Sequence, residues 1–154
     1  MRKTTTFLRF GTRAAQAANY CVSVFGGDSA VLGTTYCKDA APGRAGSVLT
    51  VRFRLAGQEY AALSGGPQFP FTEAVSLCVD CATQEEADTP WAEFTAEGEE
   101  GRCGRLKDKY GLSWQLVPHG FDEVLSDPDP ARAERAVKAM TGMRKLYIEA
   151  LRNA

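Results

Sequence analysis

Hydrophobic and polar residues alternate most clearly towards the end of the stretch 98–118. Residues 112–117 predict a strand whose two faces differ in polarity. The faces consist of Leu112, Trp114 and Leu116 on one side and of Ser113, Gln115 and Val117 on the other. The preceding segment Asp108–Gly111 predicts a tight turn, because Gly111 can adopt the positive φ that closes it. A polar face in mid-strand usually meets water or a cavity, so Gln115 is the first candidate for a binding residue.

The first part of the chain predicts the order strand, helix, strand, strand, strand. The expected elements are a strand at 4–10, a helix at 13–25, and strands at 29–36, 47–55 and 58–63. The helix is predicted from apolar residues at helical spacing, and Gly26 and Gly27 end it. The last two strands alternate in polarity around an expected hairpin turn at Ala56 and Gly57.

The same order then begins again. A strand is expected at 74–81, with Val75, Leu77 and Val79 on its apolar face and Ser76 and Cys78 opposite. Thr83–Glu86 forms a capping box for a helix that runs to about residue 96, and Pro90 should kink that helix or move its start later. The final strands are expected between 102 and 117. The repeated order suggests two modules whose sheets form a cup.

Residues 119–154 predict a separate helical extension. Asp129 can cap a helix whose first residue is Pro130. An apolar stripe, interrupted at Gly142, comprises Val137, Met140, Met143, Leu146, Tyr147, Ala150 and Leu151. Such short helices are not stable alone, so they should dock on their own domain or on a partner subunit.

Composition narrows the class of protein. The chain has 154 residues, 44% of them hydrophobic, and a net charge of −1, which suits a single globular domain. We find no basic patch for nucleic acid and no apolar run long enough for a membrane helix or a signal peptide. Five cysteines, an odd number, predict reduced thiols and a cytoplasmic location.

Motifs for common enzyme chemistry are missing. The only histidine, His119, follows the last strand, and no G-x-S-x-G elbow accompanies it. No Walker loop and no G-x-G-x-x-G after a strand occur, so methyl transfer from an S-adenosylmethionine crevice of the doubly wound type is unsupported. Cys78 and Cys81 form a C-x-x-C pair, but residues three apart on a strand face opposite sides, and the favoured interpretation is structural.

Cys103 lies between Arg102 and Arg105, whose charges would favour a reactive thiolate. A packed or inert thiol is nevertheless the favoured interpretation.

Three motifs carry a family resemblance. They are GEEGRCG-LKD-YGLSWQLVP within 98–118, ALSGGPQF at 62–69, and FLRF with AAQAANY at 7–20. Over about residues 5–118 the chain resembles the PhnB-like branch of the vicinal-oxygen-chelate superfamily, which includes glyoxalases, bleomycin resistance proteins and extradiol dioxygenases. The resemblance implies an α+β fold, with residues 1–118 as a glyoxalase-like domain of two βαβββ modules (about 4–63 and 74–118), the extension 119–154, and a homodimer.

The resemblance also bears on metal binding. Metal-binding members of the superfamily use His or Glu from four strands, and the matching positions here are about Thr6, residues 62–64, Ala74 and Gln115. None carries a carboxylate or an imidazole, so we expect no metal and no cofactor. Relatives usually have an aromatic residue at Arg105, and a basic group there would change which ligand is tolerated.

The predicted ligand site consists of Gln115, Ser76, Cys78, Ser113 and Arg52. We expect it to bind a small polar or weakly anionic molecule without a metal, with no nucleic acid or membrane partner. Two alternatives remain open: a metal-dependent lyase or dioxygenase, and a resistance-type protein that sequesters its ligand. The sequence identifies no catalytic residue and leaves open whether the protein is an enzyme.

Overall fold

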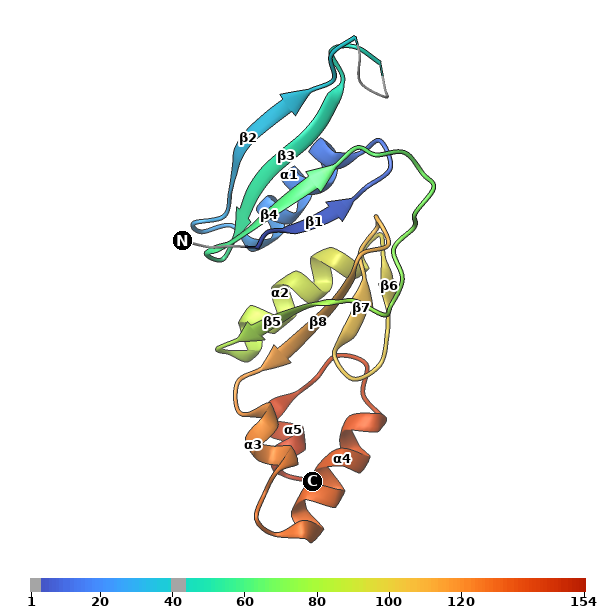
Figure 1. Ribbon diagram of the computed structural model, residues 1–154. Helices are drawn as coiled ribbons and strands as arrows, with labels where there is room; N and C mark the ends of the chain where they lie inside the picture. The colour runs from blue at the N-terminus through green and yellow to red at the C-terminus, as the bar shows by residue number, and fades with distance from the viewer. Residues whose placement is uncertain (1–3, 40–43) are drawn as a thin grey trace. The chain divides into compact units, whose positions relative to one another are not determined.

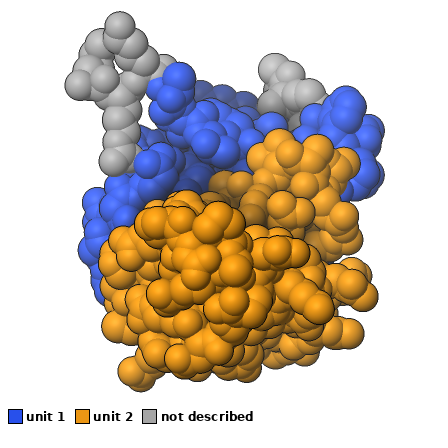
Figure 2. All heavy atoms as spheres, turned by 90° about the horizontal axis from the view of Figure 1, so that it is seen from below, with its two compact units in different colours: residues 1–71 blue, residues 72–154 orange. Residues whose placement is uncertain are grey.

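A computed structural model describes residues 4–39 and 44–154. The chain divides into two compact units, Met1–Phe71 and Thr72–Ala154 (Figure 2). Each unit has its own sheet and its own buried core, and each is described by itself below.

The first unit contains one helix and a four-stranded mixed sheet (Figure 1). Its elements are β1 (Thr6–Arg9), α1 (Ala14–Phe25), β2 (Ala30–Tyr36), β3 (Val48–Leu55) and β4 (Gln58–Leu63). The strand order is β1-β4-β3-β2, and β1 runs parallel to β4. Of the predicted apolar stripe of α1, the small residues Ala14, Ala17, Ala18 and Cys21 are buried in the core with Val51 and Phe53 of β3, whereas Val22 and Phe25 are half-buried.

The second unit repeats this arrangement. Its first elements are β5 (Leu77–Cys81), α2 (Gln84–Thr95), β6 (Glu99–Glu100), β7 (Arg105–Lys107) and β8 (Ser113–Pro118). The order β5-β8-β7-β6, with β5 parallel to β8, matches that of the first sheet. The predicted α+β fold with two βαβββ modules and a helical extension is confirmed.

The strand 74–81 was predicted too long. Glu73–Ser76 form a turn and an irregular approach to β5, and Val75, expected on the apolar face, is 70% exposed. The second strand of the module, β6, lies wholly before residue 102, where the final strands were expected to begin. The alternating pattern extends beyond the paired residues, and pairing with β8 begins only at Leu77.

The predicted capping of α2 is present, although Glu86 reaches the amide of Ala82 and not that of the cap residue Thr83. Glu86 N donates to Thr83 Oγ1 at 3.2 Å, and Glu86 Oε2 accepts from Ala82 N at 2.7 Å. Pro90 lies within the helix without moving its start, because the cap and the buried side chains of the helix hold the first turns. The Phe94 ring stacks on Trp114 with centroids 4.6 Å apart, so the apolar face of β8 packs on α2 as predicted.

The turn before β8 is fixed by the buried carboxylate of Asp108. Gly111 has φ +82° and donates its N–H to Asp108 O at 2.9 Å. Asp108 Oδ1 accepts from Tyr110 N and Leu112 N, and Oδ2 accepts from Trp114 Nε1 at 3.0 Å. Burial raises the pKa of this carboxyl, and these hydrogen bonds oppose the shift in part.

The extension forms three short helices, α3 (Phe121–Leu125), α4 (Pro130–Thr141) and α5 (Ile148–Arg152). Asp129 caps α4 as predicted, because its Oδ1 accepts from Ala131 N at 3.0 Å. The predicted stripe is only partly buried: Leu146 and Leu151 are 1% exposed, whereas Val137 is 41% exposed. The stripe breaks because the segment between α4 and α5 is not helical.

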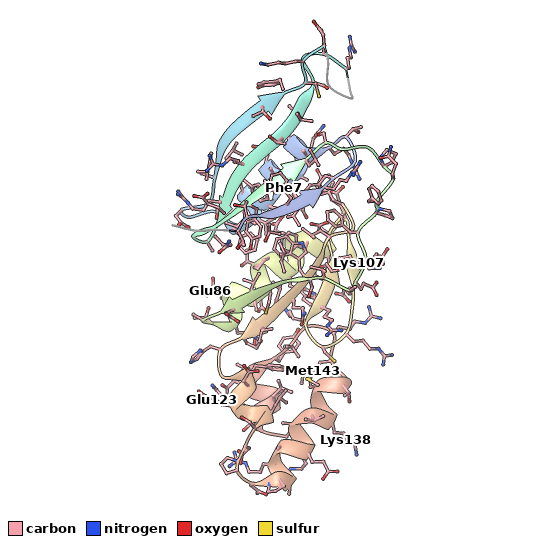
Figure 3. The ribbon with its side chains drawn as sticks, in the orientation of Figure 1. Phe7, Glu86, Lys107, Glu123, Lys138 and Met143 are labelled. Atoms are coloured by element: carbon pink, nitrogen blue, oxygen red, sulfur yellow. The ribbon has the colours of Figure 1, made fainter. Side chains whose placement is uncertain are left out.

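That non-helical segment attaches the extension to its own unit. Cys103 N donates to Met143 O at 3.0 Å and Gly104 N donates to Arg144 O at 2.7 Å. Gln84 Nε2 on α2 donates to Leu146 O at 3.0 Å. Figure 3 shows Met143 at the end of α4 that is nearer the sheet. Of the two docking sites left open by the sequence, the structure supports the chain's own domain.

Within the described residues, no helix is both long and apolar enough to cross a membrane. All five cysteines are free thiols. Burial and the nearby Glu86 and Asp80 raise the pKa of the Cys81 thiol to about 11, in agreement with a structural role.

Candidate functional site

A pocket of about 700 Å³ lies on the face of the second sheet opposite α2, and all of its lining residues belong to the second unit. Strands β7 and β8 form its floor, the loop between β6 and β7 and the segment before β5 contribute its rim, and α3 and α4 of the extension contribute a further wall. The pocket therefore combines the family-like module with the extension.

Three predicted site residues line this pocket. Gln115 Nε2 donates to Ser76 Oγ at 2.6 Å, joining β8 to the segment before β5. Ser113 is 6% exposed, and its Oγ has no hydrogen-bond partner among the described residues. A buried hydroxyl without a partner is costly, so Ser113 offers a donor and acceptor to any molecule that enters the pocket.

The other two predicted residues lie outside the pocket lining. Cys78 is the Cα partner of Gln115 in the parallel pairing of β5 and β8, but it is exposed and absent from the lining. Partial burial and the negative charge of Asp80 raise the pKa of its thiol. Arg52 belongs to the first unit, where its exposed guanidinium forms an ion pair with Glu59 at 3.2 Å.

Some charged residues of the pocket lining form ion pairs and others do not. Lys107 of β7 forms ion pairs with Glu73 and Glu99, the latter at 3.7 Å. These glutamates raise the pKa of Lys107, and Lys107 lowers the pKa of Glu73. The third lining glutamate, Glu100, accepts from Arg144 at 2.9 Å.

Arg102 and Arg105 also line the pocket, and neither forms an ion pair within the described part of the chain. Arg105 is the Cα partner of Gln115 in the antiparallel pairing of β7 and β8, so the two side chains share one face. The family resemblance marks Arg105 as a departure from the usual aromatic residue, but it does not place Arg105 in the site. Only the register of β7 against β8 shows that Arg105 lies beside Gln115.

The apolar wall was not predicted. Phe121 and Leu125 of α3 and Met140 of α4 line the pocket and are half-buried. Helical periodicity places Met140 on the apolar stripe of the extension, but it does not show which surface that stripe contacts. Helix α3 is too short to show a periodic signal at all.

Cys103 lines the same pocket with a left-handed backbone, φ +56°. Its Sγ lies 3.6 Å from Met140 O, and its N–H is used by Met143 O. These contacts hold the thiol against the extension, so packing accounts for its position.

The donors of the pocket do not fit a transition-metal site. Among residues 4–39 and 44–154, no group of three or more His, Cys, Asp or Glu side chains could hold a metal ion. The lining glutamates are each bound to a lysine or an arginine, and serine and glutamine are weak ligands for such metals. The lone histidine, His119, is exposed, and its backbone N–H donates to Cys81 O. The absence of a metal stays a prediction.

Two βαβββ modules with matching strand orders define a glyoxalase-like protein of the vicinal-oxygen-chelate class. A family model described as 3-demethylubiquinone-9 3-methyltransferase matches residues 2–117, and the chain belongs to this PhnB-like family. The extension lies outside the matched range. No curated protein matches the chain.

Solved structures support the same conclusion. A PhnB protein from Bacillus cereus, for which a 3-demethylubiquinone-9 3-methyltransferase activity has been suggested, is 35% identical; the match covers 76% of this chain and 99% of that one, with a TM-score of 0.69. Protein PA1353 from Pseudomonas aeruginosa is 14% identical over 77% and 98% of the two chains, with a TM-score of 0.63. The fosfomycin resistance protein FosX from Listeria monocytogenes is 13% identical over 80% and 97%, with a TM-score of 0.55. The last two show a shared fold only.

Proposed function

We propose that this protein binds a small polar or weakly anionic molecule, without a metal, in the pocket of its second unit. The observation that carries the proposal is the unpartnered, buried hydroxyl of Ser113 beside the Gln115–Ser76 hydrogen bond. A ligand that supplies a hydrogen bond to Ser113 would satisfy a hydroxyl that has no partner among the described residues.

The two remaining predicted residues, Cys78 and Arg52, do not line the pocket. Cys78 neighbours Gln115 across the β5–β8 pairing and would influence the site through that contact. Arg52 lies in the first unit, outside the lining of this pocket, and its predicted role of supplying charge to a carboxylate stays a prediction.

The test uses Ser113→Ala and Gln115→Ala with a thermal-shift screen of polar and monoanionic small molecules. Ser113→Ala should leave the empty protein as stable as before or more stable, because it removes an unsatisfied buried group. For the best ligand found, loss of one neutral hydrogen bond should cost about 0.5–1.5 kcal/mol in either variant, a several-fold weaker Kd. Ser23→Ala, on the exposed side of α1, is the matched control. Unchanged affinity in both pocket variants would refute the proposal.

Metal content and turnover separate the alternatives. One equivalent of zinc, iron or manganese retained through dialysis would favour the metal-dependent lyase or dioxygenase. Conversion of a bound ligand would favour an enzyme over a sequestering protein. FosX shares the fold at 13% identity, and its resistance function does not extend to this chain on that ground.

We further propose a cytoplasmic homodimer. The edge strand β2 exposes Val31 and Tyr36, which suits pairing with a second copy. The free thiols suit a reducing compartment. A mass of one chain by light scattering at micromolar concentration would contradict the dimer.

We also infer that residues 1–118 are the glyoxalase-like domain and 119–154 an addition to it. The family match, which ends at residue 117, supports this division.

A further inference from the structure

We propose that the ligand is an amphipathic monoanion, whose acidic group binds Arg105 and whose apolar part lies against the wall formed by the C-terminal extension. The inference rests on the proposed function and adds a ligand class to it. It also assigns the extension a direct role in ligand specificity.

The pairing of the charged lining residues carries the first half of the proposal. Each lining glutamate already has a cationic partner, since Glu73 and Glu99 contact Lys107 and Glu100 contacts Arg144. Arg102 and Arg105 have no acidic partner among the described residues. The lining holds three glutamates and three cations, and two of the glutamates share Lys107, so it carries no surplus charge; Arg102 and Arg105, left without an acidic partner in the described part of the chain, can nevertheless pair with an anion.

The pairing of β7 with β8 places that charge beside the neutral polar groups. Arg105 lies directly across from Gln115, and Gln115 in turn contacts Ser76. The side chain of Ser113 is on the same face of β8, two residues away, and its hydroxyl is unsatisfied. A carboxylate could thus accept from the guanidinium and from the Ser113 hydroxyl together.

The extension carries the second half. Phe121, Leu125 and Met140 supply half-buried apolar surface to the same pocket. The hydrogen bonds of Cys103 and Gly104 to Met143 and Arg144 hold this wall in place. An apolar chain covering these side chains would gain about 0.8 kcal/mol for each methylene group it buries, equal to about a fourfold gain in affinity.

Three probes separate the two halves. Octanoate has both the charge and the chain, 1-octanol lacks the charge, and acetate lacks the chain. We expect octanoate to bind at least about tenfold more tightly than either of the others, measured by calorimetry on the full chain. Equal binding of acetate and octanoate would overturn the role of the wall, and equal binding of 1-octanol and octanoate would overturn the role of the charge.

Point variants then assign the residues. Arg105→Gln should weaken octanoate about tenfold and leave 1-octanol unchanged, whereas Arg105→Lys should restore part of the loss. Lys138→Gln is the matched control, because Lys138 is an exposed cation on α4 outside the pocket (Figure 3). Equal effects of Arg105→Gln and Lys138→Gln would show that octanoate responds only to the net charge of the protein, and would refute a binding role for Arg105.

The wall is tested with Met140→Gln, a substitution of similar size. It should weaken octanoate and 1-octanol several-fold and leave acetate unchanged, whereas Val137→Gln, at an exposed position on the same helix, should change none of them. Loss of acetate binding as well would contradict a specific role for the apolar wall.

Failure of this inference can be told from failure of the proposed function. If octanoate does not bind at millimolar concentration, yet Ser113→Ala and Gln115→Ala weaken a neutral polar ligand, the pocket is a binding site for a different class. If those two variants weaken no ligand of any class, both proposals fail.

Discussion

The two units share one strand order, yet they build it from strands of different length. In the first unit, β2, β3 and β4 contain 7, 8 and 6 residues. In the second, β6 and β7 contain only 2 and 3. The long strands of the first unit satisfy most of their backbone groups within the sheet. The short strands of the second leave the amides of Cys103 and Gly104 to the extension.

This difference shows that two modules with the same topology can be stabilised by different interactions. Where strands are short, hydrogen bonds and apolar contacts must come from elsewhere. In this chain they come from the extension. Because the extension docks beside the short strands, its side chains also line the pocket.

The largest expected effect tests this dependence. Leu146 is 1% exposed and joins the extension to the second unit, so Leu146→Ala should lower the free energy of unfolding by about 2–5 kcal/mol. Urea unfolding measures the change, and amides of β7 should lose protection from hydrogen exchange. Val137→Ala, at an exposed site of α4, should cost under about 0.5 kcal/mol. Similar losses in the two variants would contradict the docking.

A smaller effect concerns the hairpin turns of the units. The β3–β4 turn at Ala56 and Gly57 has no buried carboxylate, whereas the β7–β8 turn is built on Asp108. Asp108→Asn replaces an acceptor of the Trp114 indole N–H with an amide group that must orient its oxygen and nitrogen among several donors. We expect a loss of about 1–3 kcal/mol in urea unfolding. No loss would show that the turn forms without the carboxylate.

The same variant has a pH signature. Burial raises the pKa of Asp108 above its ordinary 3.8, so the folded state binds a proton more readily than the unfolded state. Its contribution to stability is greatest below pH 3.8 and declines as the pH rises through the folded-state pKa. Because Asn cannot titrate, the stability difference between the two proteins should shrink across that window and then stay constant. A difference that grows with pH would contradict the direction of the shift.

The smallest expected effect compares equivalent glycines. Gly57 and Gly111 have φ of +81° and +82°, and a Cβ at either position would meet open space. Replacement with alanine should therefore cost about 1 kcal/mol at each site through the backbone alone. Thermal unfolding of both variants measures this, and a clearly larger loss at Gly111 would show that the Asp108 turn amplifies local strain.

Local signals in the sequence determined much of the fold. Alternation assigned the two faces of β8, and the structure places Trp114 against Phe94 and Gln115 in the pocket. Side-chain caps at Thr83 and Asp129 located two helix starts. These features depend on neighbours within a few residues, so one segment of sequence contains all the information they need.

The tertiary structure alone decided the composition of the site. That Ser113 lacks a partner, that Arg105 lies across from Gln115, and that Met140 lines the pocket all depend on contacts between segments distant in the chain. Periodicity shows that a residue is apolar or polar on its own element, but not which surface it meets. Pairing of charges is equally non-local, because Lys107 is neutralised by Glu73 from before β5 while Arg105, two residues away, has no acidic partner among the described residues.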